Sequence, residues 1–145
     1  MPSSAIWLIS LTGLVPFLTC LVLVYQHGEY AEAAKVVFLM YTGLTLSFLG
    51  GARWGAELVR APHAPNLVRL VMAAMPSIVG LLAMVPQVDL RVGYGMVVLS
   101  SLLQLAWDVS ASRAGLLPPW NGRLRTVMTV LGLLCTAAMG PALLG

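Results

Sequence analysis

Three charged side chains interrupt otherwise apolar segments of this sequence, and their types and spacing could do chemistry. Arg53 and Glu57 lie four residues apart at the end of one apolar segment, and Asp108 follows Trp107 at the end of another. If these segments are helices, Arg53 and Glu57 share one helical face and can form an ion pair. Carboxylates and guanidinium groups in such positions can bind a ligand, transfer protons or anchor a helix, depending on where they face.

A polar amide precedes Asp108 by one helical turn. An unsatisfied amide is costly in hydrocarbon, so we expect Gln104 to face the protein interior. The simplest interpretation of the neighbouring residues is anchoring, because Trp rings and long cationic side chains gather at membrane interfaces. The functional interpretation is an inward-facing polar cluster that binds a ligand or a partner. Its expected members are Arg53, Trp54, Glu57, Gln104, Trp107, Asp108, Trp120, Arg123 and Arg125.

Catalytic and cofactor motifs do not occur in the sequence. It has no His pair at metal-binding spacing, no Gly-rich phosphate loop and no nucleophile elbow. His27 and His63 fall in loops on opposite sides of the membrane in the topology below, so they cannot share a metal ion. We therefore expect no enzymatic activity, no cofactor and no metal. A membrane enzyme that uses Glu57 and Asp108 is the third hypothesis.

The composition indicates which medium surrounds the chain. Of its 145 residues, 59% are hydrophobic and only 9% are charged. About a quarter of the residues are charged in a typical soluble domain. So short a chain cannot hide this apolar surplus in one core, so lipid must cover the rest. Cys20 and Cys135 both lie in apolar segments, and we expect free thiols.

Five apolar windows predict five transmembrane helices. Four windows lack any ionisable side chain, and the fifth, residues 92–107, reaches about 24 Å as a helix, slightly less than a hydrocarbon core of about 30 Å. We expect a single all-α domain over residues 1–145, with Pro16 and Pro76 bending their helices. The first segment lacks the features of a cleaved signal and should be retained as a span. The expected helices cover about 5–25, 35–60, 67–87, 91–110 and 123–143.

Cationic residues gather on one side of this topology. Lys35 and Arg91 lie on one side, and six arginines lie on the side of the N-terminus and the second and fourth loops. The positive-inside rule then predicts a cytoplasmic N-terminus and an outside C-terminus in a bacterial inner membrane, or the equivalent in a mitochondrial inner membrane. The arginines are spread along helix boundaries, so nucleic-acid binding is not expected. The six are Arg53, Arg60, Arg69, Arg113, Arg123 and Arg125.

The chain resembles itself at an offset of 53 residues. This offset pairs Tyr41 with Tyr94, Ser47 with Ser100 and Trp54 with Trp107, and a three-residue insertion then pairs Arg69 with Arg125. The pattern predicts a duplicated two-helix unit, residues 41–88 and 94–143, whose copies cross the membrane in the same direction, as in some transporters. The alternative is two unrelated hairpins that converged on the same interfacial residue types.

Small residues recur every four positions in the second expected helix. Such residues let another helix approach closely where lipid removes the hydrophobic drive for association. We therefore expect this face to be packed. The residues are Gly43, Ser47, Gly51 and Gly55.

Three ordered motifs carry a resemblance to a known family. SFLGGARWG at residues 47–55, LAWD at 105–108 and LPPWNGRLRTVMT at 117–129 resemble the uncharacterised bacterial membrane proteins related to mitochondrial transmembrane protein 69. The resemblance implies a compact multi-helix membrane protein of undefined activity. One departure is Asn121, where an aromatic residue would be usual. The tryptophan-rich sensory proteins, also five-helix and porphyrin-binding, agree in size, but their Trp-Pro motifs do not match Pro118-Pro119-Trp120.

Two hypotheses of function follow. The first is a non-enzymatic interaction or accessory protein that docks a membrane partner, a second copy of itself or a lipid. The second is a small transporter or ligand-binding sensor whose site lies between the repeat units, near Gln104 and Asp108. The expected partners are membrane lipids and membrane proteins, without nucleic acid or metal.

Overall fold

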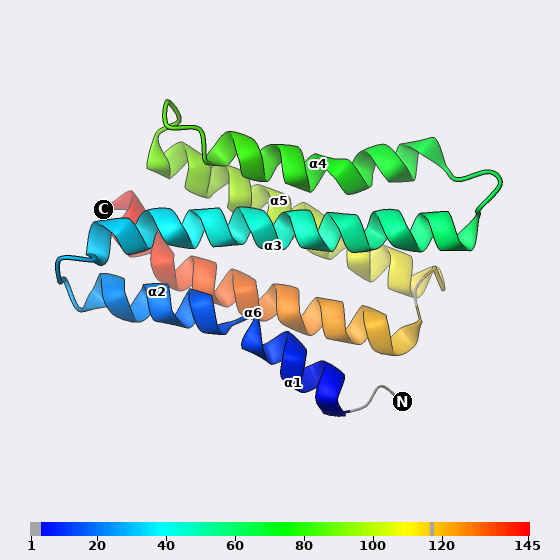
Figure 1. Cartoon of the computed structure of the whole chain (residues 1–145), viewed down its shortest axis with the longest axis horizontal. Coiled ribbons are helices and arrows are strands. Elements are labelled where there is room, and N and C mark those ends of the chain that lie inside the picture. The colour runs from blue at the N-terminus through cyan, green and yellow to red at the C-terminus, as the bar shows by residue number, and fades with distance from the viewer. Residues whose placement is uncertain (1–3, 117) are drawn as a thin grey trace.

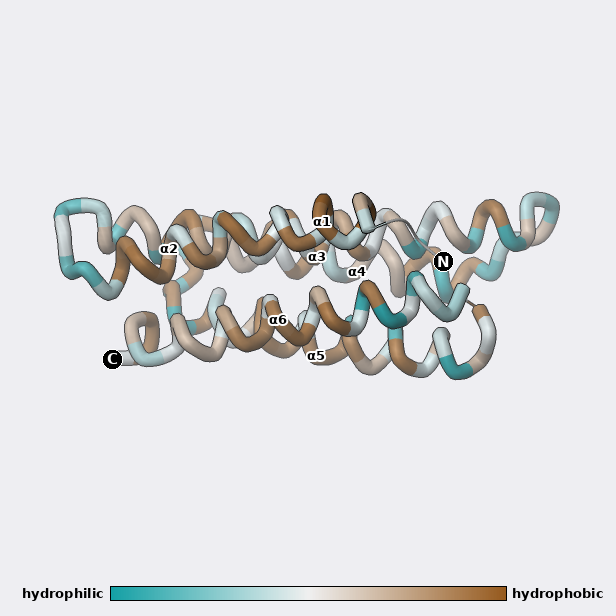
Figure 2. Tube along the Cα trace, turned by 90° about the horizontal axis from the view of Figure 1, so that it is seen from below, coloured by the Kyte–Doolittle hydropathy of each residue, from teal (hydrophilic) through white to brown (hydrophobic). Residues whose placement is uncertain are grey.

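The described residues, 4–116 and 118–145, form an up-and-down bundle of α-helices in the computed structural model (Figure 1). Helix α1 begins toward the end of the bundle where α3 and α5 finish, and the C-terminus lies at the opposite end. Seen from below, α1 to α4 form one layer and α5 and α6 form the other (Figure 2). The helices are α1 (Ser4–Thr12), α2 (Val15–Tyr25), α3 (Ala31–Arg60), α4 (Leu67–Ala83), α5 (Leu90–Arg113) and α6 (Pro119–Leu144).

Hydropathy follows the long axis of the bundle. Apolar residues dominate the middle of the helices, and polar residues gather toward the two ends and the loops (Figure 2). Four helical segments are long and apolar enough to cross a membrane, namely Ser4–Tyr25 taken across its break, α3, α5 and α6. Helix α4 has 17 residues, about the shortest length that spans a hydrocarbon core. The chain is therefore an integral membrane protein with four to five apolar spans.

The first span is interrupted, whereas the sequence predicts one bent helix. Helix α1 ends at Thr12 and α2 begins at Val15. Pro16 explains the break, because it has no N–H to bond the Thr12 carbonyl and its ring would collide with that carbonyl in a continuous helix. At the break, the carbonyl oxygen of the next residue, Gly13, accepts a hydrogen bond from the Tyr41 hydroxyl of α3, at 2.8 Å.

We expect Tyr41→Phe to lower the stability of the protein by about 1 kcal/mol, because it removes the donor that satisfies the Gly13 carbonyl at the break. The measurement is thermal unfolding in detergent micelles, followed by circular dichroism. Tyr30→Phe is the control, because Tyr30 is 62% exposed. Equal unfolding temperatures for both variants would show that the Tyr41 hydrogen bond does not support the break.

Other helix ends differ from the predicted boundaries for simple reasons. Helix α3 begins at Ala31, and its polar first turn contains an ion pair between Lys35 and Glu32, with 2.7 Å between the nitrogen and the oxygen. Helix α4 ends at Ala83, since Pro86 disfavours helical geometry in the residue before it. Helices α5 and α6 extend beyond the apolar windows, because membrane helices continue into the interface.

Among the described residues, helices α3 and α4 make a very close backbone contact. A Cβ atom added at Gly43 would lie 3.2 Å from the Gly80 Cα atom, and one added at Gly50 would collide with the Ala73 carbonyl oxygen. Ser47 and Ser77 share a hydrogen bond of 2.9 Å across the same contact. The expected packing of small residues therefore occurs between two helices of this chain.

The contact face differs from the predicted stripe at two positions. Gly51 and Gly55 are exposed, and a Cβ atom added at either position would meet no described atom within 4 Å. The face of α3 that packs on α4 instead runs through Gly43, Ser47 and Gly50. Gly51 and Gly55 therefore do not take part in the contact between α3 and α4, because a strict four-residue spacing drifts around a helix of 3.6 residues per turn.

The apolar core lies in the half of the bundle away from Asp108. Phe17 of α2 makes edge-to-face contacts with Phe38 and Tyr41 of α3, with ring centroids 5.2 and 4.9 Å apart. Val97 and Met139 are fully buried in the same core. This core fixes α2, α3, α5 and α6 against one another and leaves α1 on the edge of the bundle.

Candidate functional site

A fully buried carboxylate, Asp108 of α5, joins three helices near the end of the bundle where α3 and α5 finish. Arg125 of α6 binds it through two nitrogens, with Nε donating to Oδ2 at 3.0 Å and Nη2 donating to Oδ1 at 3.1 Å. Arg53 of α3 places Nε 2.9 Å from Oδ1. That contact is ionic, since the Arg53 N–H is not aligned for a hydrogen bond. The bidentate pair between Arg125 and Asp108 is of a strong kind that fixes the relative orientation of the two side chains.

Further contacts hold both arginines in place. Arg53 Nη2 donates to the Trp107 carbonyl at 3.0 Å, and its guanidinium carbon lies 4.4 Å from the centroid of the Trp107 ring, a cation–π contact. Arg125 Nη2 also donates to the Leu49 carbonyl at 3.1 Å. Gln104 Nε2 donates to Asp108 at 3.3 Å. We call Arg53, Gln104, Asp108 and Arg125 the Asp108 cluster.

The Asp108 cluster carries an excess of positive charge. Two guanidinium groups face one carboxylate, and all three side chains are at least nine-tenths buried. Burying a charge without a counter-charge is costly. The net charge of these three side chains is therefore +1, and one more negative group beside them would neutralise it.

Glu57 is the centre of a second, separate cluster at the same end of the bundle as Asp108. Its carboxylate accepts hydrogen bonds from Arg60 at 2.6 and 3.1 Å and from the Asn66 backbone N–H at 2.9 Å, and Arg69 of α4 lies 3.4 Å away. The expected ion pair between Arg53 and Glu57 is therefore not the one formed. Each residue reaches a partner on another element, which a local four-residue spacing does not reveal.

The remaining members of the predicted site lie outside the two clusters. Trp107 is half-buried beneath Arg53, whereas Trp54 and Trp120 are 41% and 39% exposed. Arg123 is also exposed. These three exposed side chains suit an interfacial belt, as the anchoring interpretation describes.

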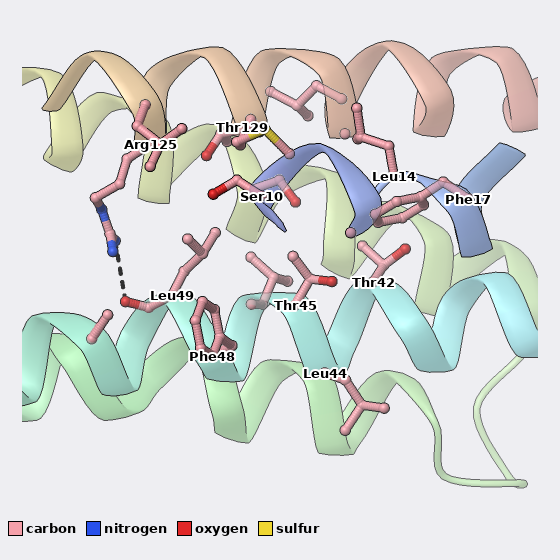
Figure 3. Close-up of a pocket in the computed structure, with 18 of the residues that line it drawn as sticks. Ser10, Leu14, Phe17, Thr42, Leu44, Thr45, Phe48, Leu49, Arg125 and Thr129 are labelled. Atoms are coloured by element: carbon pink, nitrogen blue, oxygen red, sulfur yellow. Dashed lines mark hydrogen bonds between the residues drawn. The ribbon is translucent and has the colours of Figure 1, made fainter. Parts of the chain in front are cut away.

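An apolar groove of about 630 Å³ lies near the Asp108 cluster between α1, α3 and α6, and we call it the lateral groove (Figure 3). Its volume is within the usual range for small-molecule sites, roughly 300–1,000 Å³. Ile9, Leu44 and Phe48 on its walls are 72%, 60% and 74% exposed, so the groove opens on the surface of the bundle. On α6 it runs from Trp120 to Thr136, an axial length of about 24 Å.

Polar groups in the lateral groove are few. The hydroxyls of Thr42, Thr45 and Thr136 each donate to a carbonyl of their own helix one turn earlier. The Thr129 hydroxyl is buried and has no hydrogen-bond partner among the described residues. Figure 3 shows Thr129 on the same wall as Arg125 and facing Ser10 across the space.

Arg125 connects the lateral groove with the Asp108 cluster, because it belongs to both. Within the described residues, its Nε and Nη2 donors are bonded, whereas Nη1 has no protein partner and is not fully buried. At one end of the apolar groove, Arg125 thus has N–H donors at Nη1 that no described residue accepts.

A second cavity of about 30 Å³ lies between the two clusters and has room for about one water molecule. Neither this cavity nor the lateral groove is lined by Gln104 or Asp108. In the part of the chain that the structure describes, no three His, Cys, Asp or Glu side chains form a group that could hold a metal ion. The apolar lining of the lateral groove favours an apolar ligand over a small polar solute.

The lateral groove is the feature that sequence patterns miss. It exists because α1 departs from the bundle at the break before Pro16 and because Gly132 leaves the wall of α6 open. Pro16 predicts a bend and Gly132 a position without a side chain, but neither residue predicts which helices lie beside the break.

Comparisons with known proteins gave a match to a family model and to a curated relative. A family model described as "Protein of unknown function (DUF3429)" matches residues 1–140. Over 131 residues the chain is 28% identical to transmembrane protein 69 of Xenopus tropicalis, a match that covers 90% of this chain and 51% of that protein. The chain thus spans about half the length of this relative, and no solved structure matches. The resemblance drawn from the three motifs is confirmed.

Proposed function

Because this chain belongs to the DUF3429 family of proteins of unknown function, we propose its function from the geometry of its own residues. We propose a non-enzymatic integral membrane protein that binds one acyl chain of a membrane lipid in the lateral groove. The observation that carries the proposal is the groove itself, an apolar space of about 630 Å³ between α1, α3 and α6 that opens on the surface of the bundle.

The shape and the lining of the groove support an acyl chain. A narrow apolar space about 24 Å long runs parallel to α6, as a lipid chain lies in a bilayer. Aliphatic side chains such as Ile6, Leu124 and Leu133 supply dispersion contacts along its length. A small polar solute would leave these walls without matching contacts, so the groove favours lipid over the transporter or sensor hypothesis near Gln104.

Charge distribution supports an orientation for this lipid site. The end of the bundle that holds the Asp108 cluster has six arginines and two carboxylates, a formal charge of +4, whereas the opposite end has two cations and three carboxylates, a charge of −1. By the positive-inside rule the arginine-rich end faces the cytoplasm or the mitochondrial matrix. We therefore propose an inner-membrane location with the N-terminus inside and a lipid drawn from the inner leaflet.

One structural parallel and the sequence repeat favour the proposed duplication. In each of the hairpins α3–α4 and α5–α6, a carboxylate near the end of the first helix binds an arginine near the start of the second, Glu57 with Arg69 and Asp108 with Arg125. The sequence repeat pairs these two arginines with each other. A duplicated hairpin would place the two arginines at equivalent positions, although the two carboxylates are not equivalent in the repeat, and the first span lies against α3 and α6, one helix of each unit.

We expect Gly132→Leu to reduce lipid retention about tenfold, which corresponds to about 1.4 kcal/mol. A side chain at position 132 meets no described atom within 4 Å and enters the groove, so it fills the space without disturbing packing. The measurement is native mass spectrometry of protein purified in a mild detergent. The wild type should retain about one phospholipid per chain.

Gly95→Leu is the matched control. Gly95 is exposed on α5 and outside the groove, and a Cβ atom there also meets nothing within 4 Å. Both changes place the same side chain on an open helix surface. Equal lipid retention by the two variants, or a wild type without lipid, would contradict the proposal.

A further inference from the structure

We infer that the lipid in the lateral groove carries an anionic phosphate headgroup, which is held at the Arg125 end. This inference rests on the proposed function, because it names the class of lipid for the same site. It starts from the charge of the Asp108 cluster, where Arg53 and Arg125 share one carboxylate. A phosphate beside Arg125 would supply the missing negative charge.

The donors of Arg125 point to this role. The Nη1 atom of Arg125 has no partner among the described residues, and Arg125 lines the groove. Guanidinium groups present rigid N–H donors that match phosphate oxygens. Asp108 and the Leu49 carbonyl hold the other donors, so the guanidinium group is oriented before a ligand arrives.

The second observation is the Thr129 hydroxyl. It is buried, it has no hydrogen-bond partner among the described residues, and it lies one helical turn beyond Arg125, about 6 Å along α6. In a glycerophospholipid, the acyl ester carbonyl follows the phosphate at a similar separation and leads into the acyl chain. A phosphate at Arg125 thus brings an ester oxygen to Thr129 and the chain into the apolar part of the groove.

Trp120 and Asn121 complete the polar end. Both line the groove within the first turn of α6. Asn121 adds an amide that can bond a phosphate or glycerol oxygen. Order along α6 is therefore headgroup, ester and chain, in the direction from the interface to the membrane centre.

The test compares two lipids with identical acyl chains. Delipidated protein in detergent is incubated with dioleoyl phosphatidylglycerol or with dioleoyl phosphatidylcholine, and bound lipid is counted by native mass spectrometry. We expect about tenfold greater retention of the anionic lipid, which corresponds to about 1.4 kcal/mol. Equal retention of both lipids would overturn the inference and leave the proposed function intact. Retention of neither lipid would overturn the proposed function.

Two arginine variants locate the selectivity. Arg125→Gln should bind both lipids about equally, whereas Arg123→Gln should keep the preference, because Arg123 is exposed and outside the groove. Equal loss of preference in both variants would show general attraction to a cationic surface and would overturn the inference.

Thr129→Val keeps the test decisive if Arg125→Gln does not fold, because it removes the hydroxyl without changing the volume of the side chain. We expect retention of both lipids to fall about threefold, consistent with the loss of one hydrogen bond. Unchanged retention would overturn the placement of the ester group at Thr129.

Discussion

Asp108→Asn is expected to destabilise the protein by about 3–5 kcal/mol. The substitution keeps the size of the side chain but removes the single carboxylate between Arg53 and Arg125. Two buried guanidinium groups would then face each other without a counter-charge. An asparagine can accept hydrogen bonds from one arginine, but it cannot neutralise either.

The measurement is thermal or denaturant-induced unfolding in detergent micelles. Asp89→Asn is the matched control, since Asp89 is exposed at the start of α5 and its side chain accepts a hydrogen bond from the Arg91 N–H. Asparagine is an equally good residue for that position, so no measurable change is expected. An Asp108→Asn protein as stable as the control would show that the Asp108 cluster does not hold the bundle together.

A second substitution separates charge from packing. In the Asp108→Asn background, Arg53→Met removes one of the two uncompensated cations and replaces it by an apolar side chain of similar length. Part of the lost stability should return, because buried ion pairs can often be replaced by apolar groups without loss. If the double variant were less stable than Asp108→Asn, packing by Arg53 on Trp107 would be the larger contribution.

Sequence patterns predict the helices of this chain well and their mutual contacts poorly. Each described helix overlaps one of the five apolar windows, because the part of a helix that crosses hydrocarbon must be mostly apolar. The split of the first span at Gly13 could be expected only as a bend, since Pro16 weakens a helix but tertiary contacts decide whether it breaks. The donor that compensates the break, Tyr41, lies on another helix and has no sequence signal.

The polar residues show the same division. Gln104 is expected to face inward because an unsatisfied amide is costly in hydrocarbon, and it is buried. Asp108, for which anchoring and an inward-facing cluster are both considered, is buried as well. Their binding partners could not be predicted in the same way. Arg53 shares a helical face with Glu57, yet it binds Asp108 on a different helix, because the contact depends on how α3 crosses α5.

Gly50→Leu is expected to destabilise the protein by about 3 kcal/mol, at the upper end of the usual cost of overpacking. A Cβ atom at position 50 would collide with the Ala73 carbonyl oxygen and would lie 3.7 Å from the Pro76 ring. A larger side chain must push α4 away from α3. That movement also separates Gly43 from Gly80 and breaks the Ser47–Ser77 hydrogen bond.

Gly51→Leu is the control, and it differs only by one position in the same helix. Residue 51 is exposed, and a Cβ atom there meets nothing within 4 Å. Replacing glycine by a good helix former should leave stability unchanged or raise it by up to about 1 kcal/mol. Unfolding of both variants in the same detergent gives the comparison directly.

The pair also tests the orientation of α3, because adjacent residues point about 100° apart on a helix. If α3 packs on α4 through Gly43, Ser47 and Gly50, only Gly50→Leu destabilises. If the strict four-residue stripe were the contact face, Gly51→Leu would be the damaging change. That result would turn α3 about its axis and would move Arg53 away from Asp108, so the same experiment also tests the geometry of the Asp108 cluster.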